Sequence, residues 1–105
     1  MRRGEIWWAD LPESAGRRPV LLLSRNDAYE VRALVTVAPV TTRVRAIPVE
    51  VPLSAADGVP RASVVNLDTI TTIAKSSLRE RLTVLSGARM AEVEDALRFA
   101  LGMDT

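Results

Sequence analysis

Two short strand-like segments about twenty residues apart, each joined to a polar cluster, set the strongest limit on how this chain folds. The first is the apolar run at residues 19–23, which follows Arg17 and Arg18; the second covers residues 34–38 and leads to Thr41 and Thr42. A continuous apolar run of this length is typical of a central strand that is buried on both faces. We therefore expect two buried strands, with a fixed cation at the end of one and two hydroxyls at the end of the other.

The rest of the sequence predicts further short strands and one long helix. Alternating residues at 49–53 are typical of a half-exposed strand, and short strands are also expected at residues 5–11, 62–67, 69–73 and 82–85. Ser86 is a favourable helix N-cap, and Gly102 is suited to the C-terminal end. Apolar residues recur between them at three- and four-residue spacing: Met90, Val93, Leu97, Ala100 and Leu101. The pattern predicts an α+β fold, with a small barrel-like antiparallel sheet covered by a C-terminal helix.

The length and composition limit the class of protein. A chain of 105 residues has room for one core, so we expect one domain over residues 1–105. No apolar run approaches the ~18 residues of a membrane span. Residues 1–5 lack the apolar stretch of a signal peptide. We therefore expect a cytoplasmic protein that does not enter a membrane.

The ionisable residues limit the chemistry. The chain has no His and no Cys, so any reaction on nucleic acid has to proceed without imidazole, thiolate or a His-ligated metal. We accordingly expect no metal and no cofactor. Lys75 is the only Lys among 14 cationic residues. Arginine suits bidentate contacts with phosphate, but codon bias in a GC-rich genome explains the arginine excess equally well.

Five motifs in a fixed order connect the chain to a known family. They lie at residues 3–7, 18–20, 38–41, 63–68 with 72–75, and 85–86. In this order and spacing the chain resembles the MazF/PemK family of type II toxin–antitoxin endoribonucleases. The resemblance implies an SH3-like barrel and a symmetric homodimer. It also implies metal-independent cleavage of single-stranded RNA at short motifs, and a cognate MazE-like antitoxin whose acidic tail fills the RNA groove.

Such cleavage uses the 2′-OH of the RNA as nucleophile and leaves a 2′,3′-cyclic phosphate and a 5′-OH. The site has to align this hydroxyl, stabilise charge on the phosphorane and move two protons. Arg18 is the matched charge-stabilising residue, and Pro19 after it holds its backbone extended. Thr41 is the matched hydroxyl, suited to donate to a phosphate oxygen. The alternatives are a surface salt bridge for Arg18 and a local turn hydrogen bond for Thr41.

Asp68 matches an aspartate that acts in catalysis in the PemK-type branch, so it is the candidate base. A guanidinium stays protonated in proteins, which argues against Arg18 in that role. The alternative for Asp68 is a turn acid or the partner of a nearby Arg. Further RNA contacts are expected from five residues around these motifs: Glu13, Arg17, Thr42, Arg43 and Asn66.

The chain departs from the family pattern in three places. Asn66 stands where the PemK-type branch has an Arg two residues before its catalytic Asp, so that pair is incomplete here. The loop at residues 12–17 is shorter than usual, and residues 69–72 read Thr-Ile-Thr-Thr in place of Gln-Ile-Arg-Thr. We therefore expect a different RNA motif from that of the relatives. One of Trp7 and Trp8 is expected in the core and the other in the groove or at the dimer interface, while Phe99 is expected to pack on the helix.

Two other functions remain open. One is a gyrase poison of the CcdB type, although that activity relies on a Trp-Gly-Ile C-terminus and residues 101–105 here read Leu-Gly-Met-Asp-Thr. The other is a non-catalytic module that binds RNA or an antitoxin.

Overall fold

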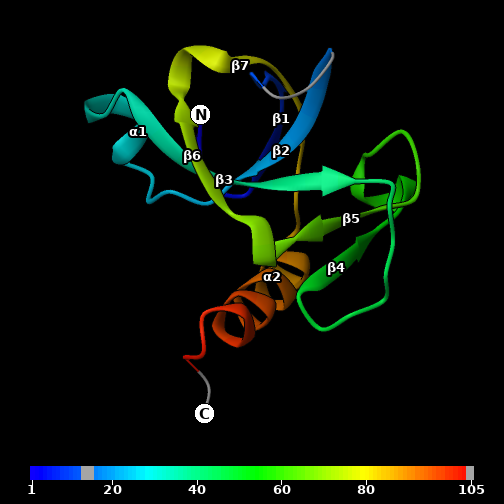
Figure 1. Cartoon of the computed structure of the whole chain (residues 1–105). Coiled ribbons are helices and arrows are strands. Elements are labelled where there is room, and N and C mark those ends of the chain that lie inside the picture. The colour runs from blue at the N-terminus through cyan, green and yellow to red at the C-terminus, as the bar shows by residue number, and fades with distance from the viewer. Residues whose placement is uncertain (13–15, 104–105) are drawn as a thin grey trace.

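The computed structural model describes residues 1–12 and 16–103. Over these residues seven strands form an antiparallel sheet with the order β4-β5-β3-β2-β1-β7, and β6 pairs with β3 beside this path (Figure 1). The strands are β1 (Glu5–Asp10), β2 (Arg17–Leu22), β3 (Leu34–Thr41), β4 (Glu50–Leu53), β5 (Ser63–Asn66), β6 (Thr71–Ala74) and β7 (Leu78–Val84). The helices are α1 (Ala28–Val31) and α2 (Gly87–Ala100), with 3-10 turns η1 (Ala55–Asp57), η2 (Leu67–Thr69) and η3 (Lys75–Ser77).

Strand β3 is the centre of the sheet. Residues 37–39 of β3 pair with β2, residues 34–37 pair with β6, and residues 40–41 pair with β5. The predicted α+β class and the C-terminal helix are confirmed. The barrel, however, is not closed, because β4 and β7 end the strand order and do not pair with each other in the part of the chain described. The strand path is therefore not closed, while the sheet-based α+β fold agrees with the prediction.

The core lies on both faces of this sheet. Leu21 belongs to one apolar cluster together with Val93 of α2, whereas Val20 and Leu22 belong to a second cluster with Tyr29. Val20, Leu21 and Leu22 each have at most 1% of their surface exposed. The prediction of a central strand buried on both faces is confirmed.

Helix α2 begins as the sequence predicts and ends slightly earlier. Ser86 Oγ accepts a hydrogen bond from the Arg89 N–H at 3.1 Å, and Gly102 adopts a left-handed backbone with φ of 68°. Val93 and Ala96 are the buried residues of the helix. Leu101 was expected in the apolar stripe but is 54% exposed, because the helix ends at Ala100. Phe99 was expected to pack from its place on the helix but is 60% exposed, so that prediction is wrong.

An ion pair ties the start of α2 to η1. Arg89 Nε donates to Asp57 Oδ1 at 3.0 Å, and the Asp57 side chain is only 10% exposed. The hydrogen bond from Arg89, followed by that from the Ser54 N–H, lowers the pKa of Asp57 below its usual value. Thr83 Oγ1 also donates to the Asp57 carbonyl at 3.0 Å. These contacts fix η1 against β7 and α2.

Acid is expected to weaken this anchor. Because the folded pKa of Asp57 is lowered, its contribution to stability is present above the unfolded pKa of about 3.9 and is lost as the pH falls through the lower folded value. In Asp57→Asn the free energy of unfolding, measured with urea, is expected to fall less between pH 5 and pH 2 than in the wild type. Asp95→Asn removes an exposed ion pair with Arg98 and serves as the matched control. Equal pH dependence in Asp57→Asn and wild type would contradict the prediction.

Candidate functional site

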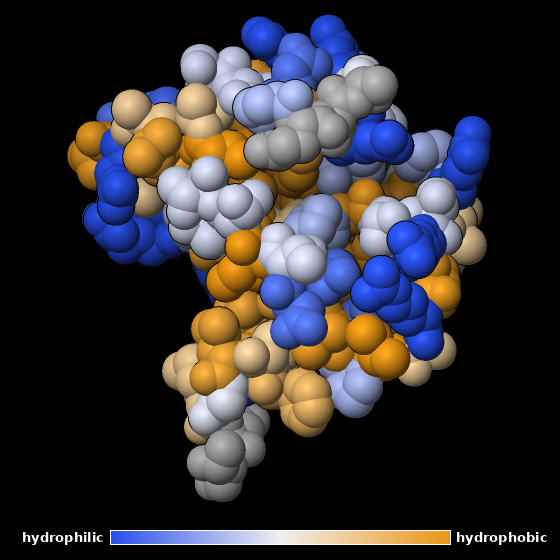
Figure 2. All heavy atoms as spheres, in the orientation of Figure 1, coloured by the Kyte–Doolittle hydropathy of each residue, from blue (hydrophilic) through white to orange (hydrophobic). Residues whose placement is uncertain are grey.

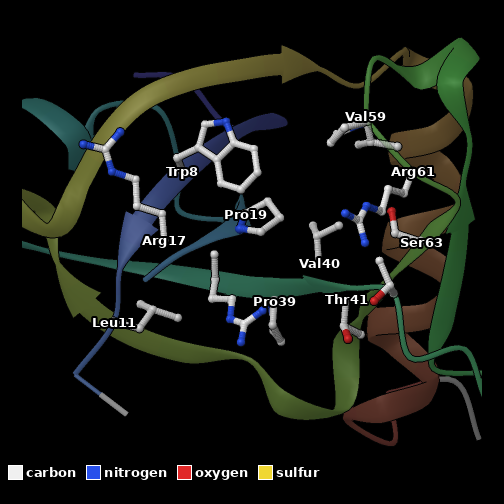
Figure 3. Close-up of a pocket in the computed structure, with 13 residues that line it drawn as sticks. Trp8, Leu11, Arg17, Pro19, Pro39, Val40, Thr41, Val59, Arg61 and Ser63 are labelled. Carbon is white, nitrogen blue, oxygen red and sulfur yellow. The ribbon is translucent and has the colours of Figure 1, made fainter. Parts of the chain in front are cut away.

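A pocket of about 750 Å³ opens where several strands end. Its walls come from four segments: the end of β1 with Leu11, the start of β2, the end of β3, and residues 59–63 (Figure 3). The last of these segments leads into β5. Three arginines line it, Arg17, Arg18 and Arg61, and no Asp or Glu among the described residues does. Figure 3 shows Arg17 and Arg61 on opposite sides of the pocket with Trp8 and Val40 between them. The pocket is therefore suited to an extended anion with an aromatic or apolar part.

Pairing of β2 with β3 brings Arg18 and Thr41 to the same place. The register pairs Val20 with Pro39, and Arg18 and Thr41 each lie two residues beyond this pair on their strands. Both residues line the pocket. Within residues 1–12 and 16–103 the Arg18 guanidinium makes no hydrogen bond or ion pair, so the surface salt bridge considered for it is not found there. The Arg18 side chain is exposed, and none of these described residues neutralises its charge.

Thr41 combines a structural role with a free donor. Its Oγ1 accepts a hydrogen bond from the Arg43 N–H at 3.1 Å, which is the local turn bond considered as the alternative. Accepting this bond leaves the hydroxyl hydrogen of Thr41 available for donation. Thr42 lines the pocket beside it and is exposed. The turn bond therefore orients the Thr41 hydroxyl without using its donor.

Arg17 also lines the pocket but has counter-ions. Its Nε lies 3.8 Å from Asp10 Oδ1, and its guanidinium lies 3.7 Å from Glu80 Oε1. The three side chains are 45–67% exposed, so these pairs are weak. Arg17 is thus less freely available to an anion than Arg18.

Other predicted residues lie elsewhere. Asn66 and Asp68 do not line the pocket, because the chain turns into η2 at that point: Asn66 Oδ1 accepts the Asp68 N–H at 2.9 Å and caps this turn. The Arg43 side chain is not among the lining residues. Glu13 lies outside the described residues. The structure thus brings together Arg17, Arg18, Thr41 and Thr42 from the predicted set.

The two tryptophans divide as expected. Trp7 packs against the second core cluster, and its Nε1 donates to Glu5 Oε1 at 2.9 Å. Burial, the largest influence, raises the pKa of Glu5, but the hydrogen bonds from Trp7 and Arg2 contribute to a net lowering. Trp8 points the other way and lines the pocket. Its ring is the one aromatic surface that the described residues offer to a ligand there.

Arg61 and Ser63 were not foreseen. Arg61 is exposed and directly follows Pro60. This pair has the residues of Arg18–Pro19 in reverse order, and it is the one sequence feature that could have pointed to Arg61. Ser63 opens one of the motifs but had no role assigned to it. It is 6% exposed, and its Oγ has no hydrogen-bond partner among the described residues.

Glu50 holds the chain that leaves the site. Its side chain is buried, and Oε1 accepts the N–H groups of Arg45 and Ala46 at 2.9 and 3.0 Å. Ala46 has a positive φ of 55°, which is unfavourable for a residue with a Cβ. The carboxylate thus fixes the turn that follows Thr42.

Removing that carboxylate is expected to destabilise the protein. Glu50→Ala leaves two backbone N–H groups without their acceptor, for a loss of about 2 kcal/mol in the free energy of unfolding. Glu50→Gln keeps an acceptor oxygen and is expected to lose less. Urea denaturation of both variants measures this difference. Equal losses in the two variants would show that the hydrogen bonds to the turn contribute little.

Two kinds of feature are absent from the described residues. No group of three or more His, Cys, Asp or Glu within residues 1–12 and 16–103 is arranged to hold a metal ion. None of the helices in the same ranges is both long and apolar enough to cross a membrane.

Comparisons with known proteins show the family to which the chain belongs. Residues 2–101 match the family model described as the PemK-like, MazF-like toxin of type II toxin-antitoxin systems. A probable endoribonuclease MazF5 of Mycobacterium tuberculosis is 41% identical over 100 residues, which cover 94% of this chain and 91% of that protein.

Solved structures show the same architecture. A mycobacterial endoribonuclease in complex with its cognate antitoxin superposes with a TM-score of 0.90 at 31% identity, covering 100% of this chain and 98% of that chain. MazF in a MazE–MazF crystal structure from Deinococcus radiodurans gives a TM-score of 0.83 at 34% identity, with 97% and 95% covered. Because the family model spans nearly the whole chain and these relatives exceed 30% identity, the chain belongs to the PemK/MazF family of type II toxin–antitoxin toxins.

Proposed function

We propose that this protein is the toxin of a type II toxin–antitoxin pair and an endoribonuclease that cleaves single-stranded RNA without a metal. Family membership supports the toxin role, and the relatives named as endoribonucleases support the activity. The observation that carries the proposal is the pocket in which Arg18 and Thr41 meet at the ends of two buried strands. Rigid strands supply the positional accuracy that such chemistry needs.

In the proposed reaction the ribose 2′-OH attacks the neighbouring phosphorus and the P–O5′ bond breaks. The products are a 2′,3′-cyclic phosphate and a 5′-OH. The Arg18 guanidinium binds the non-bridging oxygens in a bidentate way and stabilises the charge that builds there. Thr41 donates its free hydroxyl hydrogen to one of the same oxygens. Both contacts strengthen as negative charge develops, which is the condition for a faster chemical step.

Two protons move in this reaction. Arg18 is suited to pass a proton to the leaving 5′ oxygen, but not to accept one from the 2′-OH. Asp68, the base expected from the family match, does not line the pocket, so its role stays a prediction. The pH dependence of cleavage by Asp68→Asn tests it: loss of the acidic limb of the rate profile is expected if Asp68 is the base.

Binding of the RNA uses the remaining lining residues. Trp8 offers a face on which one base stacks, and Arg17 and Thr42 contact the backbone. With so few aromatic groups, phosphate contacts and hydrogen bonds supply most of the affinity. The target is most simply messenger RNA, whose cleavage inhibits translation and growth in the cytoplasm.

Cleavage of a sequence-diverse RNA pool in EDTA tests the proposal. We expect cutting at a short motif, with products that carry 5′-OH and cyclic-phosphate ends. A substrate with a 2′-deoxyribose at the cut position should resist cleavage, because it lacks the nucleophile. No cleavage by folded protein would favour the non-catalytic binding module, and growth arrest without RNA cleavage would favour the gyrase poison.

Partners follow from the same family. One solved relative is described as an endoribonuclease in complex with its cognate antitoxin, and another as a MazE–MazF crystal structure. We propose for this chain a MazE-like antitoxin whose acidic segment occupies the arginine-lined pocket. We also propose a homodimer. Apolar surface remains beside α1 and at the end of α2 in Figure 2, where four side chains are 46–73% exposed: Val31, Leu34, Leu101 and Met103. Light scattering at micromolar concentration should give twice the 11.5 kDa chain mass, and a monomer would contradict the dimer.

A further inference from the structure

The part of the pocket around Arg61 has a separate set of polar groups. It is built from residues 59–63, whereas Arg18 and Arg17 come from β2. Figure 3 shows Arg61 extending into the pocket with Ser63 beside it, on the side away from Arg17. Pairing of Thr41 with Val64 sets this segment next to the end of β3. Arg61 therefore adjoins the proposed reaction centre without belonging to the β2–β3 pair that forms it.

Arg61 has a charge that the described residues do not neutralise. Its guanidinium makes no ion pair and no hydrogen bond within residues 1–12 and 16–103, in contrast to Arg17, Arg79 and Arg89. The acidic residues nearest along the chain are Asp57 and Asp68, and the first of these is bound to Arg89. A guanidinium that no described residue neutralises, facing a pocket that no described Asp or Glu lines, is suited to an external anion.

Ser63 supplies the second, independent sign of a ligand. It is 94% buried, lines the same pocket, and its Oγ has no partner among the described residues. Buried hydroxyls in folded proteins are nearly always hydrogen-bonded, so an unpaired one next to a pocket calls for an explanation. Figure 3 shows the Arg61 side chain beside Ser63, so the two residues border the same part of the pocket.

The segment is also firmly held at its base. Val59 is 5% exposed and belongs to the first core cluster, and the preceding Gly58 has a left-handed backbone with φ of 91°. The Arg89–Asp57 and Thr83–Asp57 contacts anchor the turn before it. Arg61 is thus presented by a rigid support, which reduces the entropy lost on binding.

We propose that Arg61 and Ser63 form a second phosphate subsite, which binds an RNA phosphate next to the one that is cleaved. The inference rests on the proposed function, since that function defines the RNA as the ligand. The subsite contacts the backbone and so contributes affinity and register rather than base identity. Arg18 stabilises the reacting phosphate, and Arg61 holds the chain so that this phosphate is in place.

Equilibrium binding at several salt concentrations tests the subsite. The probe is a fluorescent single-stranded RNA with 2′-deoxyribose at the cut position, or the RNA pool with 2′-O-methyl riboses if no cut is found. Arg61→Ala is expected to weaken binding about tenfold and to reduce the salt slope by about 0.7, the value for one phosphate contact on a single strand. Arg61→Lys should keep the slope because it keeps the charge. Arg98→Ala, on the face of α2 outside the pocket, is the matched control and should change neither quantity.

Ser63→Ala separates a binding role from a structural one. If the hydroxyl serves the RNA, its removal lowers RNA affinity severalfold while the midpoint of urea unfolding stays the same or rises. In steady-state cleavage, Arg61→Ala should raise KM more than it lowers kcat. An unchanged salt slope in Arg61→Ala, or unchanged affinity in Ser63→Ala, would overturn the subsite.

The two proposals fail in different ways. RNA that binds with the expected Arg61 effect but is not cut would remove the endoribonuclease activity and keep the subsite. RNA that is cut, with binding unaffected by Arg61→Ala, would keep the activity and remove the subsite. A loss of kcat in Arg61→Ala as large as that in Arg18→Ala would also overturn it, because Arg61 would then act on the reacting phosphate.

Discussion

Arg18→Ala is expected to lower RNA cleavage by about 100- to 1,000-fold while leaving the fold intact. The guanidinium is the group that meets charge as it builds on the phosphorane, and a single preorganised donor of this kind accounts for a loss of that order. The fold should be unaffected, because the Arg18 side chain is exposed and makes no hydrogen bond or ion pair with the described residues. Exposed substitutions of this type usually change stability by less than about 0.5 kcal/mol.

The measurement is kcat/KM on an end-labelled RNA in EDTA, with urea unfolding of the same samples. Arg18→Lys is the informative second variant. Lysine keeps the charge but cannot make the bidentate hydrogen bonds of a guanidinium, so we expect an activity between those of Arg18→Ala and wild type. Arg98→Ala removes an arginine from α2 and should cleave like wild type. Activity of Arg18→Ala within threefold of wild type would remove Arg18 from the reaction.

The parts of the site that could be predicted are those encoded locally. The run at residues 19–23 has the composition of a strand buried on both faces, and Arg18 directly precedes it, so the position of this arginine at a strand end followed from neighbouring residues alone. The same holds for Thr41 at the end of β3. That the two meet depends only on the pairing of two strands close in sequence.

What escaped prediction depends on contacts between distant segments. Arg61 reaches the pocket because β5 pairs with β3 across more than twenty residues, which no local pattern reveals. Asp68, matched to a catalytic Asp of the PemK-type branch, follows Asn66 into η2 and does not line the pocket, so its role as the base stays a prediction. The sequence predicts a strand only from residue 82, but β7 begins at Leu78. Arg79, Glu80 and Arg81 are all charged and exposed, as is common on an edge strand. This stretch therefore lacks the alternation of apolar and polar residues that indicates a half-buried strand.

Gly58→Ala is expected to cause the largest loss of stability, about 3 kcal/mol. Two costs add. The left-handed backbone at φ of 91° costs a residue with a Cβ about 1–2 kcal/mol, and crowding in a packed site costs about 1–3 kcal/mol more. The crowding arises because the new Cβ would lie 2.8 Å from Thr83 Cβ and closer still to its hydroxyl. Thr83 cannot turn away without losing its hydrogen bond to the Asp57 carbonyl.

Gly102→Ala separates the two costs. Gly102 also has a left-handed backbone, with φ of 68°, but nothing lies within 4 Å of the position its Cβ would take. It should therefore lose only the backbone share, about 1 kcal/mol, which corresponds to a fall of roughly 4–8 °C in Tm against roughly 10–25 °C for Gly58→Ala. Equal losses in the two variants would show that β7 does not crowd this turn.

The difference between these variants also bears on the pocket. Crowding at Gly58 is relieved most easily by displacing the turn away from β7, and residues 59–63 are attached directly to that turn. At a temperature where Gly58→Ala is still folded, its RNA affinity should therefore fall as in Arg61→Ala, whereas Gly102→Ala should bind RNA like wild type. Unchanged affinity in folded Gly58→Ala would mean that the wall of the pocket holds its position through Val59 in the core rather than through the turn.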